Sequence, residues 1–196
     1  MRTPNQGKRL FKNPVLEWLS RSSAPLVISS LFIVALAVFC LGIFQMRISF
    51  WKLAFLFLVG LVLFSLAEYL IHRFVFHDGD YKAGKSWKTK IHAIHHDIPT
   101  DPERLTLPLP VALFASFLVF FIFKIILGNL AFGVFPGFIS GYAFYLLVHF
   151  LIHTRKPPQN HLKILWRNHH IHHHLKEDKA YGVTTPFWDW VFGTLP

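Results

Sequence analysis

Ten of the thirteen histidines in this chain fall into four short groups, each at the edge of a long apolar stretch. Neutral imidazole is the commonest metal ligand in proteins, and packing alone rarely gathers so many groups that titrate near pH 7. The groups are His72 and His77; His92, His95 and His96; His149 and His153; and His169, His172 and His173. Their type and position indicate a metal site at the surface of a membrane.

The spacing within three of the groups is helical. Residues three and four apart lie on one face of an α-helix, with their Cβ atoms about 5–6 Å apart. The second and fourth groups have the i, i+3, i+4 spacing and the third has i, i+4, so each can present its imidazoles to one or two ions. Ten imidazoles are too many for one tetrahedral or octahedral ion, and we therefore expect two metal ions.

The first group has a different spacing. His72 and His77 are five residues apart, which places their side chains about 140° from each other on an α-helix. We therefore expect them to reach different metals, or the helix to end between them. The histidines outside the pattern are interpreted as surface residues or as residues that contact the ligands without binding the metal. They are His161, His170 and His174.

The composition is that of a membrane protein. Hydrophobic residues make up 53% of the chain, charged residues only 15%, and phenylalanine occurs 22 times. Four stretches are long enough to cross about 30 Å of hydrocarbon as helices, at about 1.5 Å per residue. These stretches are residues 25–44, 51–71, 109–127 and 130–152. Small residues in the fourth stretch, at Gly133, Gly137, Ser140 and Gly141, permit a close helix approach.

The positive charge follows the membrane spans. Of the 20 lysine and arginine residues, all but Arg47, Lys52 and Lys124 lie in segments that an even number of spans places on one side. The positive-inside rule assigns that side, with both termini, to the cytoplasm. This distribution argues against a nucleic-acid partner despite the net charge of +10. A bacterial inner membrane is favoured, with the endoplasmic reticulum as the alternative.

The sequence therefore predicts an all-α integral membrane protein. Four transmembrane helices form two hairpins, and all four histidine groups emerge on one membrane face. There a cytosolic helical cap, from residues 72–108 and 153–196, holds a dimetal site. We expect a basic cytosolic tail at residues 1–24 and one membrane domain at residues 25–196.

The order HxxxxH, HxxHH, HxxxH, HxxHH resembles the fatty acid hydroxylase/sterol desaturase superfamily of membrane di-iron enzymes. EYLIHRFVFH (68–77) looks like the first motif of fatty acid 2-hydroxylases, and HHDIPTDPERL (95–105) is similar to their second. YGVTTPFWDWVFGT (181–194) resembles the C-terminal signature of that family. The resemblance extends from about residue 64 to the end and is more specific for the superfamily than for the substrate.

The resemblance implies an O₂-dependent monooxygenase that hydroxylates a membrane lipid at C2 of a fatty acyl chain, as a free acid or within a sphingolipid. It implies two iron ions held by the ten histidines. Zinc outranks Fe²⁺ in affinity for such ligands and can replace iron in a purified sample. The cytochrome b5 domain often fused to eukaryotic 2-hydroxylases is not seen in this sequence. We therefore expect a separate electron-transfer protein of the cytochrome b5 or ferredoxin type.

Three acidic residues are candidates for orienting the ligands: Glu68, Asp97 and Asp189. Glu68 lies four residues before His72, on the same helix face, and could accept a hydrogen bond from a ligand imidazole. A salt bridge to Arg73 or a lysine is the alternative.

Two other functions are weighed against lipid 2-hydroxylation. Carotenoid or sterol hydroxylation, or desaturation, could occur on the same scaffold, and the shape of the substrate channel would discriminate them. A metal transporter would place ionisable residues within the spans, and these spans lack them in their middle parts, with Lys124 near a helix end as the nearest exception. Transport is therefore disfavoured.

Overall fold

The computed structural model describes residues 12–14, 17, 21–77 and 101–196. Within these ranges the regular secondary structure is helical and contains no strand, which confirms the all-α prediction. The second histidine group and one candidate carboxylate lie outside the described residues. They are His92, His95, His96 and Asp97.

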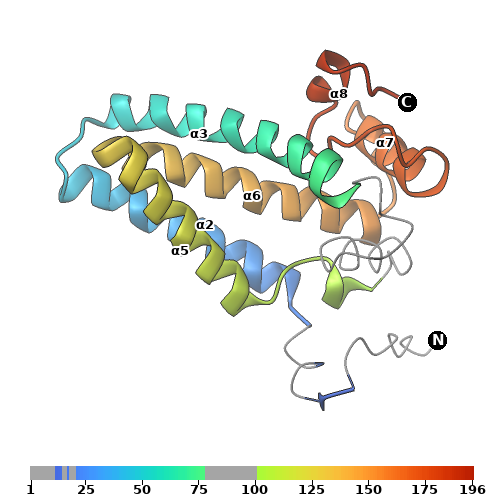
Figure 1. Ribbon diagram of the computed structural model, residues 1–196, viewed down its shortest axis with the longest axis horizontal. Coiled ribbons are helices and arrows are strands. Elements are labelled where there is room, and N and C mark those ends of the chain that lie inside the picture. Colours follow the sequence, from blue (N-terminus) through green and yellow to red (C-terminus); the bar gives the residue numbers. More distant parts are fainter. Residues whose placement is uncertain (1–11, 15–16, 18–20, 78–100) are drawn as a thin grey trace.

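Four long helices form the body of the molecule (Figure 1). They are α2 (Ala24–Phe44), α3 (Phe50–Ile71), α5 (Leu109–Leu127) and α6 (Ala131–Thr154). Both ends of each helix lie within two residues of the ends of a predicted apolar stretch. Gly128 ends α5 with a φ of 57°, in the left-handed region that favours glycine, and the 3-10 turn η4 (Gly128–Leu130) leads into α6.

Three segments are long and apolar enough to cross a membrane: Ala24–Phe44, Phe50–Phe76 and Pro102–Thr154. The third, of 53 residues, contains both α5 and α6. The outward sides of these helices carry large apolar residues that remain exposed, such as Ile33 at 67% and Ile126 at 71%. Surfaces of this kind suit a hydrocarbon surrounding and indicate a membrane protein.

Helix α6 is the centre of the bundle, packed against α2, α3 and α5 (Figure 1). Its backbone meets that of α3 where Gly137 faces Phe57 and Gly60 faces Val134. A Cβ atom at either glycine would overlap a backbone carbonyl oxygen of the other helix. At Gly141 a Cβ would come within 2.8 Å of Phe64. The prediction of a close approach along this side of α6 is confirmed.

The remaining helices lie at one end of the bundle, where α3 and α6 both end (Figure 1). α3 continues as a π-helical turn, η1 (His72–Phe76), and a 3-10 turn, η3 (Pro102–Arg104), precedes α5. Helices α7 (Lys163–His174) and α8 (Phe187–Val191) follow α6. This arrangement brings the histidines at the ends of α3 and α6 next to those of α7.

Candidate metal centre

A three-histidine cluster joins the end of α3 to α7. His72, His77 and His172 each direct a ring nitrogen into one region, and the three nitrogens lie within 4.8 Å of one another. The π-helical turn explains why residues five apart meet, because its i→i+5 pitch stacks residue i+5 near residue i. The rings of His72 and His77 are 5.1 Å apart. The two side chains therefore meet in one cluster and do not diverge as they would on an α-helix, and the α-helical part of α3 ends at Ile71, just before the pair.

The spacing of the ring nitrogens in this cluster suits a shared ion. The Nε2 atoms of His77 and His172 are 3.0 Å apart. Two nitrogens bound to one ion at about 2.1 Å, at right angles to each other, are separated by about 3.0 Å. Burial and the proximity of His172 lower the pKa of His77 to about 3, and burial lowers the pKa of His172 to about 4. Both rings are therefore neutral near pH 7, as metal ligation requires.

Backbone carbonyls fix the outer ring nitrogens of two candidate ligands, His72 and His172. The Nδ1 atom of His72 lies 2.6 Å from the carbonyl oxygen of Tyr181. In the same way, the Nδ1 atom of His172 lies 2.8 Å from the carbonyl oxygen of Lys179. A carbonyl can only accept, so Nδ1 carries the hydrogen in both rings. Nε2 is then the lone-pair nitrogen that faces the cluster.

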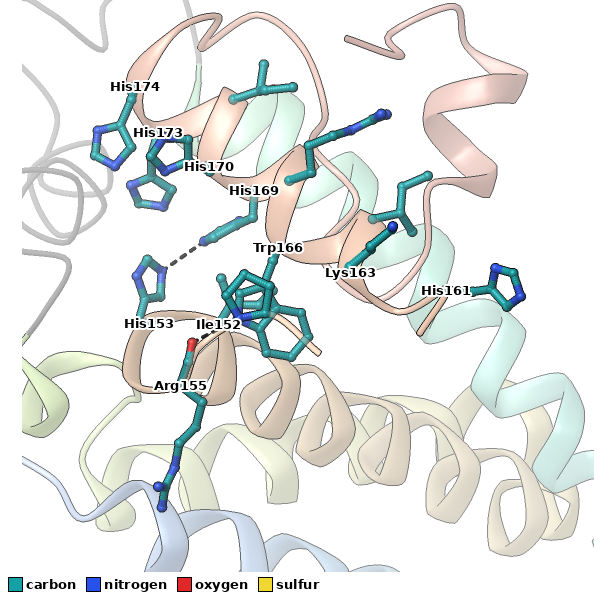
Figure 2. Close-up of a pocket in the computed structure, with 14 residues that line it drawn as sticks. Ile152, His153, Arg155, His161, Lys163, Trp166, His169, His170, His173 and His174 are labelled. Atoms are coloured by element: carbon teal, nitrogen blue, oxygen red, sulfur yellow. Dashed lines mark hydrogen bonds between the residues drawn. The ribbon is translucent and has the colours of Figure 1, made fainter. Parts of the chain in front are cut away.

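A four-histidine cluster joins the end of α6 to the same helix α7. His149, His153, His169 and His173 place one ring nitrogen each within 4.8 Å of the others. The Nε2 atoms of His153 and His169 are 2.9 Å apart (Figure 2). This separation again matches two nitrogens at right angles on one ion.

Helix α7 divides its three predicted ligands between the clusters. His169 and His173, four residues apart, face α6, whereas His172 faces the end of α3. The clusters are neighbours, because the ring centroids of His172 and His173 are 5.9 Å apart. Seven of the ten predicted ligands thus form two adjacent all-nitrogen groups, a donor set suited to divalent iron or zinc.

The loop that fixes His72 is itself held by Glu68. The carboxyl group of Glu68 accepts hydrogen bonds from the backbone N–H of Val183 at 2.7 Å and of Thr184 at 3.0 Å. It also accepts from the Thr184 hydroxyl at 2.5 Å. Among the described residues, Glu68 hydrogen-bonds to this loop and not to a histidine or to Arg73, unlike the predicted imidazole contact and the alternative salt bridge to Arg73. Glu68 thus acts on His72 through the loop.

Asp189 holds the other half of that loop. It is fully buried and accepts from the backbone N–H of Tyr181 at 2.9 Å and of Gly182 at 2.8 Å. The Thr194 hydroxyl donates to it at 2.7 Å, and burial raises the pKa of the Asp189 carboxyl. A Cβ atom at residue 182 would overlap the carbonyl oxygen of Thr185 and approach Asp189 within 2.8 Å. Only glycine therefore fits between the carboxyl group and the loop.

The sequence pattern missed the orienting groups that belong to the backbone. The carbonyls of Lys179 and Tyr181 have no residue-type signature, so nothing in the sequence indicates their role. The histidines outside the predicted groups lie around an open pocket of about 780 Å³ beside the four-histidine cluster (Figure 2). They are His161, His170 and His174.

Comparison with known proteins assigns this chain to a family. A family model described as fatty acid hydroxylase matches residues 57–194, and the chain belongs to that family. It is 38% identical, over 132 residues, to the ceramide very long chain fatty acid hydroxylase scs7 of Schizosaccharomyces pombe, covering 64% of this chain and 38% of the relative. The resemblance read from the histidine motifs is thereby confirmed.

Two further relatives extend the comparison. A dihydroceramide fatty acyl 2-hydroxylase of Arabidopsis thaliana is 36% identical, covering 65% of this chain and 55% of the relative. The solved structure titled "Full length scs7p (only hydroxylase domain visible)" superposes with a TM-score of 0.84 at 29% identity, covering 95% of this chain and 71% of the other. The chain thus spans about half or less of the full length of these sequence relatives.

The relatives found come from yeasts, a plant and mammals. They give no support to the expectation of a bacterial inner membrane.

Proposed function

We propose that this chain is a membrane monooxygenase that hydroxylates C2 of a fatty acyl chain, free or within a ceramide-type lipid. The observation that carries the proposal is the pair of adjacent, all-histidine clusters at the end of an apolar helix bundle. Its relatives named as ceramide and dihydroceramide fatty acyl hydroxylases favour the same substrate class.

In this proposal the ten predicted histidines hold two iron ions. Three come from the described cluster at the end of α3, four from the cluster at the end of α6, and the second histidine group supplies the remainder. Bound iron would supply the oxidant that, with O₂, two electrons and two protons, converts a C–H bond to C–OH and releases water. The protein's own part is to fix the imidazoles, which the carbonyls of Lys179 and Tyr181 do for two of them.

The depth of the ligands favours attack near the lipid headgroup. We propose that α2, α3, α5 and α6 each cross the membrane and that α7 and α8 form a cytosolic cap, with both chain termini on that side. His72 and His149 then lie where the spans leave the hydrocarbon. An amphiphile anchored by its headgroup at this level would offer its first carbons to the centre, as C2 hydroxylation requires.

The remaining parts of the proposal concern partners and boundaries. Residues 25–196 act as one hydroxylase domain behind a basic tail. Two electrons per turnover come from a separate cytochrome b5 or ferredoxin type protein, and the membrane is that of the endoplasmic reticulum if the source resembles the relatives found.

Lipid mass spectrometry of cells that express the chain tests the proposal. We expect acyl chains that carry one additional oxygen atom, mapped to C2 by fragmentation. The His172→Ala variant should abolish them, whereas His161→Ala, at an exposed position outside both clusters, should retain them. Oxygen added to carotenoids or sterols would show that these lipids, and not fatty acyl chains, are the substrate. An unchanged lipid profile, with iron bound and a donor supplied, would refute the hydroxylase.

A further inference from the structure

The outer side of α7 carries a pair of histidines that the proposed centre does not use. His170 and His174 are one helical turn apart, and their ring centroids are separated by 4.5 Å. Both side chains are exposed, whereas His169, His172 and His173 of the same helix are buried. Packing therefore does not account for the pair.

The spacing of this pair allows a bidentate chelate. Two imidazoles four residues apart on a helix can bind one divalent ion together, with water at the remaining positions. Within the described part of the chain, neither His170 nor His174 hydrogen-bonds to another residue, so both rings are available. Their place in the last turns of α7 also favours a cation, because the carbonyl end of a helix carries partial negative charge.

A continuous series of rings leads from this pair to the four-histidine cluster. His174 is 5.9 Å from His173, measured between ring centroids, and His173 is 5.0 Å from His153 and 4.4 Å from His169. All of these residues, with His170, line the same open pocket (Figure 2). An ion held at the outer pair thus lies next to His173, a member of the buried cluster.

We propose that His170 and His174 form an entry site that captures a divalent metal ion and delivers it through His173 to the four-histidine cluster. The proposal rests on the metal centre described under the proposed function. In the transfer, the imidazole of His173 replaces one outer imidazole on the ion, and the buried ligands then replace the other. Only metal–nitrogen bonds form and break in this exchange, one for one, so the oxidation state of the ion does not change.

The charges around the pocket suit temporary binding. Arg155, Lys163 and Arg167 line it and repel a cation, which weakens capture at the outer pair. A relay site has to release its ion. Because two imidazoles bind the ion more weakly than the four-histidine cluster does, the ion moves from the outer pair to that cluster.

Zinc binding to the full chain in detergent tests the entry site. The protein is freed of metal with a chelator and dialysed against increasing free Zn²⁺, and zinc per chain is counted. The test variant is His170→Ala with His174→Ala, and the matched control is His161→Ala, at the far end of the same pocket (Figure 2). We expect wild type and control to bind one more weakly held zinc per chain than the double variant. The tightly held zinc should be equal in all three.

The rate of uptake provides a second readout. Capture raises the local metal concentration beside the cluster, so the double variant should fill its tight sites about tenfold more slowly at limiting zinc. Equal weak binding, or equal uptake rates, in wild type and double variant would overturn the entry site alone. Absence of any tightly held zinc in the wild type would refute the metal centre, and the relay with it.

Discussion

The Nδ1–H of His72 donates to the carbonyl oxygen of Tyr181 across 2.6 Å, and this contact joins the end of α3 to the C-terminal loop. The same loop is held by Glu68 through Val183 and Thr184. The candidate ligand His72 is therefore oriented by the carbonyl of Tyr181, in a loop that the carboxyl groups of Glu68 and Asp189 hold in place.

Asp189→Asn is expected to weaken metal binding at the three-histidine cluster. The amide can offer only one acceptor oxygen where the carboxyl group meets the N–H groups of Tyr181 and Gly182 and the Thr194 hydroxyl. The carbonyl of Tyr181 is the outer partner of His72, and displacing such a partner lowers metal affinity about 10–100-fold. Competition with a chromophoric chelator measures this affinity. Asp178→Asn, at an exposed position, is the control, and an unchanged affinity in Asp189→Asn would contradict the proposed role of the loop.

Thr184→Val is expected to weaken the attachment of the C-terminal loop to α3. The variant keeps the shape of the side chain but removes the hydroxyl that donates to Glu68 at 2.5 Å. Removing one partner of a buried acceptor costs about 1–3 kcal/mol. For a domain of this size about 1 kcal/mol shifts the melting temperature by roughly 2–4 °C. Thermal unfolding in detergent measures the shift, and Thr184→Ser should melt close to wild type. Equal melting of the valine and serine variants would argue against this bond.

Gly137→Ala is expected to separate α3 from α6. The added methyl group would overlap the carbonyl oxygen of Phe57, which belongs to backbone and cannot rotate away. Overpacking of this kind costs about 1–3 kcal/mol or more. Gly42→Ala is the graded control, since its Cβ would meet side-chain atoms of Leu53 and Phe132 at 3.1 Å. Comparable melting temperatures for the two variants would contradict the close backbone approach.

Removal of metal is expected to destabilise the end of the bundle that contains α7. A ligand that binds only the folded state at 100 times its dissociation constant stabilises it by about 2.7 kcal/mol. Chelator treatment should therefore lower the melting temperature, and added Fe²⁺ or Zn²⁺ should restore it. His172→Ala should show a smaller response than His161→Ala, because only His172 belongs to a cluster. A melting temperature that is insensitive to chelator in the wild type would count against the centre.

Zinc is expected in protein purified without added iron. Histidine-only ligand sets bind Zn²⁺ more tightly than Fe²⁺, so affinity alone does not select iron. Elemental analysis of the purified chain measures the metals directly. Iron alone at full occupancy would show that something other than ligand affinity selects it.

The sequence by itself determined the helices and the residues that meet at their ends. Apolar stretches of about 20 residues suit membrane helices whatever their neighbours are, and small residues along α6 indicated where another helix would approach. Helical spacing placed His149 beside His153 and His169 beside His173, because positions four apart share a face.

Only the tertiary structure decided how the histidines are shared. The π-helical turn at His72, where the end of α3 contacts the C-terminal loop, brings His77 beside His72 against the α-helical expectation. The histidines of α7 are divided between two clusters because this helix lies across the ends of both α3 and α6. The groups that orient His72 and His172 are backbone carbonyls, which every residue type carries, so their positions come from the folded chain alone.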